Sequence, residues 1–262
     1  MSIINQLILS VRDSGMIQVM YNIGIPIAFV VLMFFMNKYR LHYRLKWKQS
    51  FFALVVVFVT TYLWMLVLTW MQNGFKNFGQ NNIVRVFTWI PLFGLLTAKI
   101  LKIDFNRMMD FLAVPIALWH PITHTTCVFP GCCHGYLCDW GIISLQKTQE
   151  MIAEGKLASG EYARTFPTQW LECLVALGVF FAVKAIAKKT KYDCSGKLYP
   201  YFLLLFGGTR FFLEFLRDNN KLFWGISDLA LHAAAMVLVG AVWLLILRMR
   251  TPAPKQKAAK KA

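Results

Sequence analysis

The stretch S-F-F-A-L-V-V-V-F-V-T-T-Y-L-W-M-L-V-L-T-W-M, from Ser50 to Met71, carries no charged residue. It is long enough to cross the hydrocarbon core of a bilayer, which is about 30 Å thick. Hydrophobic residues make up 58% of the 262-residue chain and charged residues only 15%. Because a soluble domain of this length needs less apolar material for its core, the composition predicts an integral membrane protein.

Further apolar runs of similar length lie on both sides of this stretch. They are Met16–Met36, Ile83–Leu101, Met108–Phe129, Pro167–Ala187, Tyr199–Leu216 and Leu222–Leu247. We therefore expect an all-α integral membrane protein with about seven transmembrane helices. Residues 1–250 would form a single polytopic domain with an outer loop at about 136–166, followed by a basic tail at 251–262.

The formal net charge is +16, and the basic residues fall in alternate loops rather than in one patch interleaved with aromatic residues. This distribution argues against a nucleic-acid partner. Lys and Arg are enriched in cytoplasmic loops, so the loops after the first, third, fifth and seventh helices are expected in the cytoplasm. The N-terminus is then outside and the C-terminus cytoplasmic. The tail is expected to be solvated or to contact anionic lipid headgroups.

The segment V-F-P-G-C-C-H-G-Y-L-C places Cys132, Cys133 and His134 between two glycines at the mouth of an apolar run. Irregular polar backbone is tolerated in a bilayer only where it is buried in protein or lines a cavity, so this cluster predicts the edge of a site. Four cysteines cluster on the outer side, and zinc is one interpretation, although adjacent cysteines seldom share an ion and C-x-x-C is absent. The possible ligands are Cys127, Cys132, Cys133, Cys138 and His134. Small residues packing a tight turn are the other interpretation. We predict no metal and treat Cys132 and Cys133 as candidate functional thiols.

His120 and His124 are spaced i, i+4, which puts both imidazoles on one face of the fourth helix. Hydrogen bonding to helix carbonyls, a two-histidine metal pair, and an acid–base or phosphate-binding role are all open to them. The next helix opens with F-P-T-Q-W-L-E, which places Gln169 and Glu172 near one another. An ordinary interfacial helix start is the alternative for that motif.

In G-G-T-R-F-F-L-E-F-L-R, Arg210, Glu214 and Arg217 fall at i, i+4 and i+7 and are predicted on one face of the sixth helix. Charges at this depth are costly unless they are paired or used. Arg210 and Glu214 could neutralise each other while Arg217 reaches the headgroups. Alternatively, the three leave an uncompensated positive charge suited to the phosphate of a phospholipid.

Taken in order, the motifs are an Asp-led helix ending in G-C-C-H-G, then P-T-Q-x-x-E, then R-x-x-x-E-x-x-R. This order resembles the prolipoprotein diacylglyceryl transferase family, particularly divergent members with a G-C-C-x-G turn. The likeness covers about Asp104 to Arg217. Members of that family transfer the diacylglyceryl group of phosphatidylglycerol to the lipobox cysteine of a prolipoprotein and release glycerol 1-phosphate.

The resemblance implies a multi-pass protein of the bacterial cytoplasmic (inner) membrane that needs no cofactor. Its expected partners are phosphatidylglycerol, other membrane lipids and the signal peptide of a prolipoprotein. Arg210, with Arg217, would hold the headgroup phosphate, and Glu214 would orient Arg210. Gln169 and Glu172 would line the same cavity.

Three polar positions of the family pattern differ in this chain. The H-G-G histidine of the third helix is replaced within Trp89–Gly94, the arginine of the fourth helix falls near His124, and Phe166 stands for the histidine of H-P-T-Q. We expect His124 to act as the catalytic base, with His120 and His134 as substrate-binding substitutes.

Two alternatives of other classes remain. One is a thiol-dependent membrane enzyme of redox or acyl-handling type that uses Cys132 and Cys133. The other is a non-catalytic protein that binds or transports anionic phospholipid through the same arginines.

Overall fold

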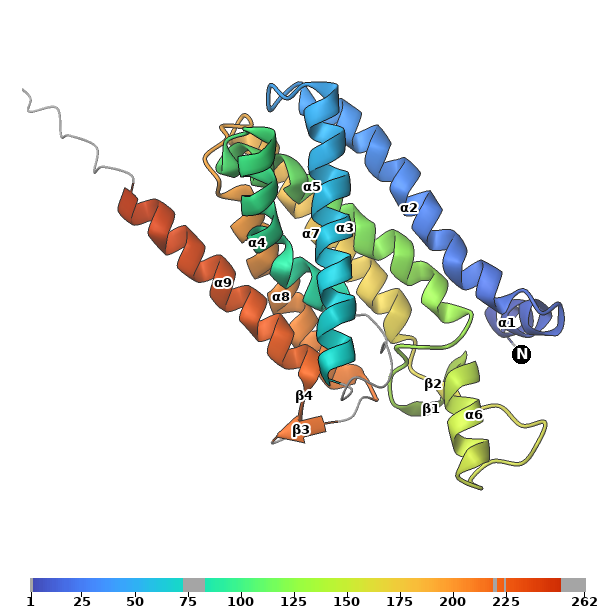
Figure 1. Ribbon diagram of the computed structural model, residues 1–262. Helices are drawn as coiled ribbons and strands as arrows, with labels where there is room; N and C mark the ends of the chain where they lie inside the picture. Colours follow the sequence, from blue (N-terminus) through green and yellow to red (C-terminus); the bar gives the residue numbers. More distant parts are fainter. Residues whose placement is uncertain (1, 73–82, 219–220, 224, 251–262) are drawn as a thin grey trace, which may run out of the picture.

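The computed structural model describes residues 2–72, 83–218, 221–223 and 225–250, which form a helical bundle with two small sheets (Figure 1). The helices are α1 Ile3–Asp13, α2 Ile17–Arg40, α3 Trp47–Gln72, α4 Ile83–Leu101, α5 Phe105–Thr125, α6 Leu145–Ala153, α7 Thr168–Lys189, α8 Leu198–Leu213 and α9 Asp228–Arg250. The strands are β1 Leu137–Ile143, β2 Arg164–Thr165, β3 Lys221–Phe223 and β4 Ile226–Ser227, paired antiparallel as β1–β2 and β3–β4. The predicted tail at 251–262 and the Gly- and Asn-rich loop at 73–82 lie outside the described residues.

A helix overlaps each of the seven predicted apolar ranges, but several of the boundaries differ by three residues or more. The fourth predicted helix ends at Thr125 and the sixth at Leu213, each followed by a single 3₁₀ turn. The last helix begins at Asp228 rather than Leu222. There the Ser227 hydroxyl oxygen accepts the Ala230 N–H at 3.1 Å, and such capping favours a helix start at this point.

Within the described chain, four helices are long and apolar enough to cross a membrane: α2, α3, α7 and α9. Val86–Leu101 of α4 is a shorter apolar helix. α5 is the central helix, because every residue from Met108 to Leu118 is buried and its neighbours are α2, α4, α7 and α8. A helix enclosed by other helices can carry polar groups that a lipid-facing helix could not.

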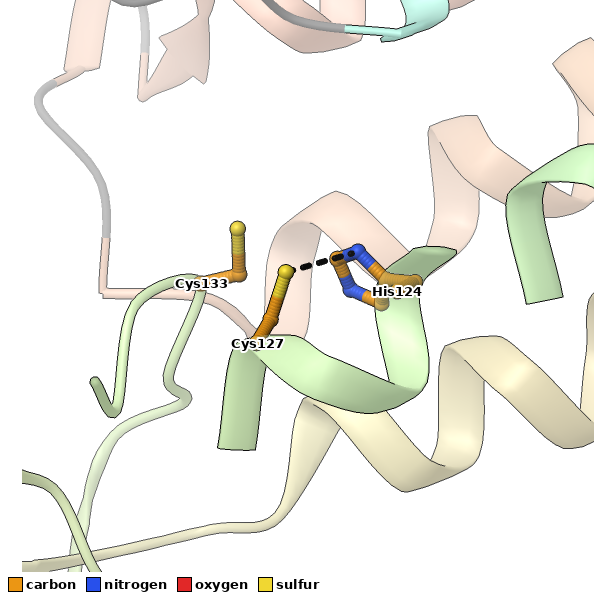
Figure 2. Close-up of side chains that lie close together, drawn as sticks. All are labelled: His124, Cys127 and Cys133. Atoms are coloured by element: carbon orange, nitrogen blue, oxygen red, sulfur yellow. Dashed lines mark hydrogen bonds between the residues drawn. The ribbon is translucent and has the colours of Figure 1, made fainter. Parts of the chain in front are cut away.

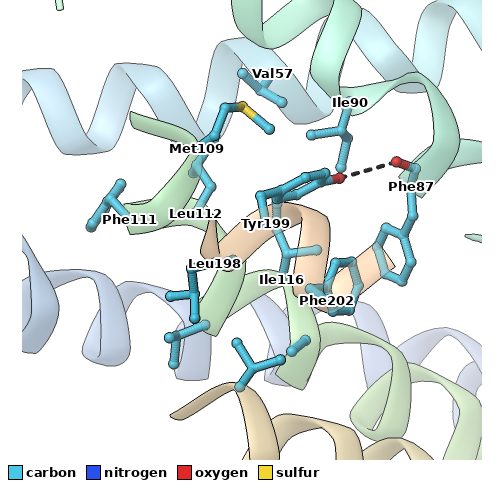
Figure 3. Packing of buried hydrophobic residues seen from close by; sticks show 14 of the residues in the cluster. Val57, Phe87, Ile90, Met109, Phe111, Leu112, Ile116, Leu198, Tyr199 and Phe202 are labelled. Atoms are coloured by element: carbon cyan, nitrogen blue, oxygen red, sulfur yellow. Dashed lines mark hydrogen bonds between the residues drawn. The ribbon is translucent and has the colours of Figure 1, made fainter. Parts of the chain in front are cut away.

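The core is packed by aromatic and aliphatic side chains from α3, α4, α5 and α8 (Figure 3). The buried Tyr199 hydroxyl donates to the Phe87 carbonyl oxygen at 3.0 Å, which satisfies its polar end. α8 and α9 approach closely at Gly207, where an added Cβ would lie 2.9 Å from the Ala233 carbonyl oxygen. Small residues permit such backbone contacts between membrane helices.

One end of the bundle gathers the loops between α2 and α3 and between α7 and α8. The His42 ring stacks on Tyr192 with centroids 4.2 Å apart. The Asp110 carboxylate of α5 accepts the backbone N–H groups of Gly196 at 2.7 Å and Leu198 at 2.8 Å. These loops and the helix ends beside them carry a group of basic residues, so positive charge is concentrated at this end. They include Lys38, Arg40, Arg44, Lys46, Lys48, Lys188, Lys189, Lys191 and Lys197.

The opposite end carries the segment from 136 to 166, in which β1, α6 and β2 form a small subdomain (Figure 1). The sequence did not predict α1, which packs against this segment. Asn5 Oδ1 accepts the Ile143 N–H at 2.9 Å, and Ile8 packs with Val128 and Ile142. α1 and the end of α9 therefore lie at opposite ends of the molecule (Figure 1).

Candidate active site

A buried charged network joins the last turns of α5, the start of α7 and the end of α8, with Glu172 at its centre. Glu172 Oε1 lies 3.0 Å from Arg210 Nη1, while Oε2 lies 2.7 Å from His124 Nε2 and 4.0 Å from His120 Nε2. The two imidazole rings stack with centroids 4.7 Å apart. The sequence places no carboxylate between the histidines, but the neighbouring helix supplies one.

Glu214 is the second carboxylate of the network. Its Oε2 lies 2.8 Å from Arg210 Nη2, and its Oε1 accepts the Ser227 hydroxyl at 2.9 Å. Arg210 is therefore held between two carboxylates, one from α7 and one from its own following turn.

Arg217 points into the network rather than toward headgroups. The chain leaves α8 through the 3₁₀ turn Glu214–Leu216, and Arg217 is extended and bridged to Gly135. Its Nη1 lies 3.7 Å from a carboxylate oxygen of both Glu172 and Glu214, and the residue is only 6% exposed. The alternative of an Arg217 reaching the membrane surface is therefore wrong, as is a single helical face for all three charges.

The network balances its own charge. Arg210 and Arg217 face Glu172 and Glu214, so the formal charge is zero when both imidazoles are neutral. An uncompensated positive charge was predicted from α8 alone, and Glu172 of α7 cancels it. Hydrogen-bonding capacity nevertheless remains. Among the described residues, Arg210 Nε and Arg217 Nε and Nη1 are buried donors without a hydrogen-bond partner. Buried polar groups usually have one, so these donors point to a polar ligand or water.

The G-C-C-H-G turn lies beside this network and is held by the start of α7. The Thr168 hydroxyl donates to the Cys133 carbonyl oxygen at 2.6 Å, and Gln169 Nε2 donates to that of Cys132 at 2.7 Å. Cys133 adopts a left-handed backbone with φ of 59°, which is uncommon for a residue with a side chain. Gln169 thus positions the turn rather than contacting the charged groups directly.

Three thiols gather at this turn, and two of them approach His124. Cys127 Sγ lies 3.6 Å from His124 Nδ1, and the ligand atoms of His124, Cys127 and Cys133 all lie within 4.8 Å of one another (Figure 2). Cys132 Sγ donates to the Cys127 carbonyl oxygen at 3.7 Å. Cys138, which was predicted to cluster with them, lies apart on β1. All six cysteines are free thiols.

A comparison with known protein families matches residues 16–247 to prolipoprotein diacylglyceryl transferase. The chain belongs to this family. No curated protein matches it significantly. Family membership, together with the apolar helices, identifies a multi-pass membrane protein of a transferase family whose members act on lipid and prolipoprotein.

Two of the three positions at which this chain departs from the family pattern are occupied by apolar packing. Ile90, within the segment that replaces H-G-G, is fully buried in the helical core. Phe166, in place of a histidine, stacks on Tyr136 with centroids 5.2 Å apart. Neither position supplies an ionisable group, whereas His120 and His124 of α5 lie beside Glu172, which pairs with both arginines.

The structure separates His134 from the other predicted histidines. Its Nδ1 lies 3.1 Å from the Gly135 carbonyl oxygen, and its own carbonyl accepts the Asp218 N–H at 3.3 Å. Asp218 also pairs with Lys147 of α6 at 2.6 Å. Hydrogen bonding to Asp218 raises the pKa of Lys147 above its usual value, so this lysine remains charged at neutral pH.

Sequence reasoning missed the contributions of Ser227 and Thr168 to the site. Ser227 serves both Glu214 and the start of α9, and the signal for it was a serine followed by Asp228 ahead of an apolar run. Thr168 follows Pro167 at the opening of α7, where its hydroxyl meets a turn about 35 residues earlier in the chain. No local pattern marks that contact.

Proposed function

We propose that this protein transfers the diacylglyceryl group of phosphatidylglycerol to the lipobox cysteine of prolipoproteins and releases glycerol phosphate. The observation that carries the proposal is the buried network of Arg210, Arg217, Glu172 and Glu214, with its unpartnered guanidinium donors, in a member of the transferase family. The same helices provide an apolar environment for the acyl chains.

Arg210 and Arg217 differ in the number of donors that they can offer to the headgroup phosphate. Both terminal nitrogens of Arg210 face carboxylates, which leaves its Nε as a donor. Arg217 has Nε and Nη1 without hydrogen-bond partners, so two of its donors are available to phosphate oxygens. We therefore assign the main phosphate contact to Arg217 and a supporting contact to Arg210. Charge developing on the departing phosphate is stabilised there.

The acceptor thiol is ionised at the His124 end of the network. Glu172 holds His124 through Nε2, so Nδ1 faces the cysteine turn, where an incoming thiol would lie. The resulting thiolate attacks the glyceryl carbon that carries the phosphate, the C–O bond breaks, and the thioether forms. The His120 ring stacks on the His124 ring beside the pair of His124 and Glu172.

The topology we propose has seven crossings, with the N-terminus outside and the C-terminus in the cytoplasm of a bacterial cell. The basic loops then face the cytoplasm, in keeping with the usual bias of Lys and Arg. The network and the 136–166 segment face outward, on the side where a translocated prolipoprotein presents its signal peptide.

Purified protein incubated with phosphatidylglycerol and a lipobox peptide tests this proposal. Diacylglyceryl peptide and glycerol phosphate are followed by mass spectrometry. We expect Arg217→Lys to lower the rate by about 10²-fold, as loss of a transition-state donor does. Arg164→Lys serves as a matched control, because Arg164 is exposed and, within the described chain, its side chain donates to the Asp139 carbonyl oxygen.

The histidine assignment has its own test in the same assay. A triple variant, His120→Ala, His124→Ala and His134→Ala, should abolish the thioether product while phospholipid still binds. Full activity of that variant would contradict thiol ionisation at the His124 end. Binding of phospholipid by the wild-type protein without any product would favour a lipid-binding or transport role instead.

A further inference from the structure

The thiols beside His124 have a geometry suited to a tetrahedral metal ion. Zinc lies about 2.0–2.1 Å from an imidazole nitrogen and about 2.3 Å from a thiolate, which places the two ligand atoms about 3.6 Å apart in a tetrahedral site. The observed separation of His124 Nδ1 and Cys127 Sγ is 3.6 Å (Figure 2). Cys133 Sγ lies within 4.8 Å of both atoms, so a small shift of one side chain completes a three-ligand site.

The second ring nitrogen of His124 is arranged as in a metal ligand. Its Nε2 lies 2.7 Å from Glu172 Oε2, at hydrogen-bond distance in the interior of the protein. A histidine that binds a metal through one nitrogen almost always donates the other N–H to a carboxylate, carbonyl or water. An N–H on Nε2 leaves the lone pair of Nδ1 directed at the thiols.

The second group of candidate ligands, His120, His124 and Glu172, is less suited to a cation. Glu172 already faces the guanidinium of Arg210 at 3.0 Å and that of Arg217 at 3.7 Å, so a further positive charge there would be repelled. Arg217 also contacts the Cys133 thiol, but the thiols can lose their protons and supply compensating negative charge. Two thiolates would neutralise a divalent ion, and soft sulfur ligands select zinc or copper(I) over harder ions.

The turn brings Cys133, rather than Cys132, into the three-ligand group with His124 and Cys127. Cys133 is held in a left-handed conformation, with its carbonyl fixed by Thr168. Cys132 Sγ is directed to the Cys127 carbonyl oxygen and is not part of the three-ligand group. Three protein ligands are typical of catalytic zinc sites, whose fourth position takes water or substrate, whereas four are typical of structural sites.

We infer that His124, Cys127 and Cys133 bind a zinc ion whose fourth position takes the acceptor cysteine as a thiolate. This inference rests on the proposed diacylglyceryl transfer and names the means by which the acceptor is activated. A thiol that coordinates zinc is deprotonated. A metal therefore supplies the ionisation that the replaced family histidine would otherwise provide.

The atoms and charges of this step balance. The acceptor thiol binds zinc as a thiolate, and its proton passes to water. The sulfur then attacks the glyceryl carbon, an S–C bond forms, and the C–O bond to phosphate breaks with its electron pair on the phosphate oxygen. Glycerol phosphate leaves, and the neutral thioether dissociates from the ion. Arg217, which contacts the Cys133 thiol, balances the extra negative charge of the third thiolate.

Metal content of the full-length protein in detergent provides the first test. The wild type should contain stoichiometric zinc by mass spectrometry of the metal, and Cys127→Ser and Cys133→Ser should lose it. Cys138→Ser, which changes a thiol on β1, should keep it. Folded wild-type protein without zinc after incubation with Zn²⁺, or equal zinc in all variants, would overturn the inference. Glu172→Gln should weaken zinc affinity by about 10- to 100-fold through the lost outer contact.

A cobalt-substituted wild-type protein tests the acceptor position without relying on variants that fail to fold. Addition of a lipobox peptide should increase the thiolate-to-cobalt charge-transfer absorption, whereas a peptide with Ser in place of Cys should not. An unchanged spectrum would contradict binding of the acceptor to the ion. Loss of metal in Cys132→Ser equal to that in Cys133→Ser would indicate a closed four-ligand structural site and would also overturn the inference.

Different results would contradict the transferase reaction and the role of zinc. A spectral response to peptide without any diacylglyceryl product would contradict the transferase reaction. Product formed at the full rate by protein stripped of zinc with a chelator would contradict the role of the metal and leave the transferase intact.

Discussion

Glu172 contacts Arg210, Arg217 and His124, none of which lies on its own helix. Buried charges are stable only when partners satisfy them, and removal of one partner leaves the others exposed to the low dielectric of the interior. Because the network is neutral as a whole, each carboxylate is needed to hold the arginines in place. Glu172 therefore organises the site through its contacts with three other segments of the chain.

Glu172→Gln should destabilise the protein by about 3–5 kcal/mol, the usual cost of breaking a buried ion pair. Unfolding in detergent, followed by circular dichroism, measures the change. Glu150→Gln is the matched control, because the Glu150 side chain is 42% exposed and its pairing with Lys147 lies on the surface. Equal stability of the two variants would show that the network contributes nothing to the fold.

The pair of Lys147 and Asp218 should give a small pH-dependent contribution. Asp218 raises the pKa of Lys147, so the stabilisation is complete below the unfolded lysine pKa of about 10.4 and is lost as the pH rises through the higher folded value. Lys147→Met should lower stability by at most about 1 kcal/mol at neutral pH. The difference in melting temperature from wild type should vanish at the most alkaline pH. A difference that is constant up to that pH would argue against the pair.

At the scale of elements, the turn between α5 and β1 connects the network to the outer segment. Gly131 has a φ of +71°, and an added Cβ would lie 2.6 Å from the Leu145 backbone nitrogen and 2.7 Å from the Ser144 Cα. Both the conformation and the space therefore require glycine. The Ser144 hydroxyl also donates to the Gly131 carbonyl oxygen at 2.8 Å, which ties the turn to α6.

Gly131→Ala should displace the turn and abolish activity, because the Cys133 and Cys127 thiols would move out of their positions beside His124. Gly155→Ala is a matched control, since Gly155 has a similar φ of +70° but no atom within 4 Å of the added Cβ. The control should cost only the strain of a left-handed alanine, about 1 kcal/mol. Activity and melting temperature of both variants separate backbone strain from steric displacement, and similar losses in both would contradict the contact argument.

The sequence predicted the long helices well and the short elements poorly. Apolar runs of membrane length leave little alternative to a helix, so α2, α3 and α9 were found, although α9 begins later than predicted. α1 escaped prediction because an 11-residue amphipathic helix has no membrane-length signal. β2, β3 and β4 escaped prediction because each is only two or three residues long.

The site was predicted in parts rather than as a whole. Helical spacing finds partners on one helix, such as Arg210 and Glu214, which pair as expected. It cannot find partners across helices, so the approach of Glu172 to His124 had no sequence signal. The excess positive charge was predicted wrongly for this reason.

For the whole molecule, the division into a basic end and an end with the charged network is the main organising feature. The loop residues His42 and Tyr192 stack at one end, while the 136–166 segment and α1 lie at the other (Figure 1). The two ends thus differ in charge and in chemistry. This polarity is what a transferase working at one membrane face requires.

The proposed orientation can be measured with reporter fusions in a bacterial host. A fluorescent protein fused after Arg250 should fluoresce, and alkaline phosphatase at the same position should be inactive, because both results require a cytoplasmic C-terminus. Phosphatase inserted near Gly155, in the outer segment, should be active. The reverse pattern would contradict the assignment of the network to the outer face.

The most direct test of the central claim is the stoichiometry of products from the wild-type protein. Phosphatidylglycerol with a labelled headgroup and a lipobox peptide are supplied in lipid nanodiscs, and both products are quantified together. We predict equimolar diacylglyceryl peptide and labelled glycerol phosphate, with neither formed from a peptide in which Ser replaces Cys. Bound phosphatidylglycerol that remains intact, with no thioether, would contradict the assignment of the Glu172 network to diacylglyceryl transfer.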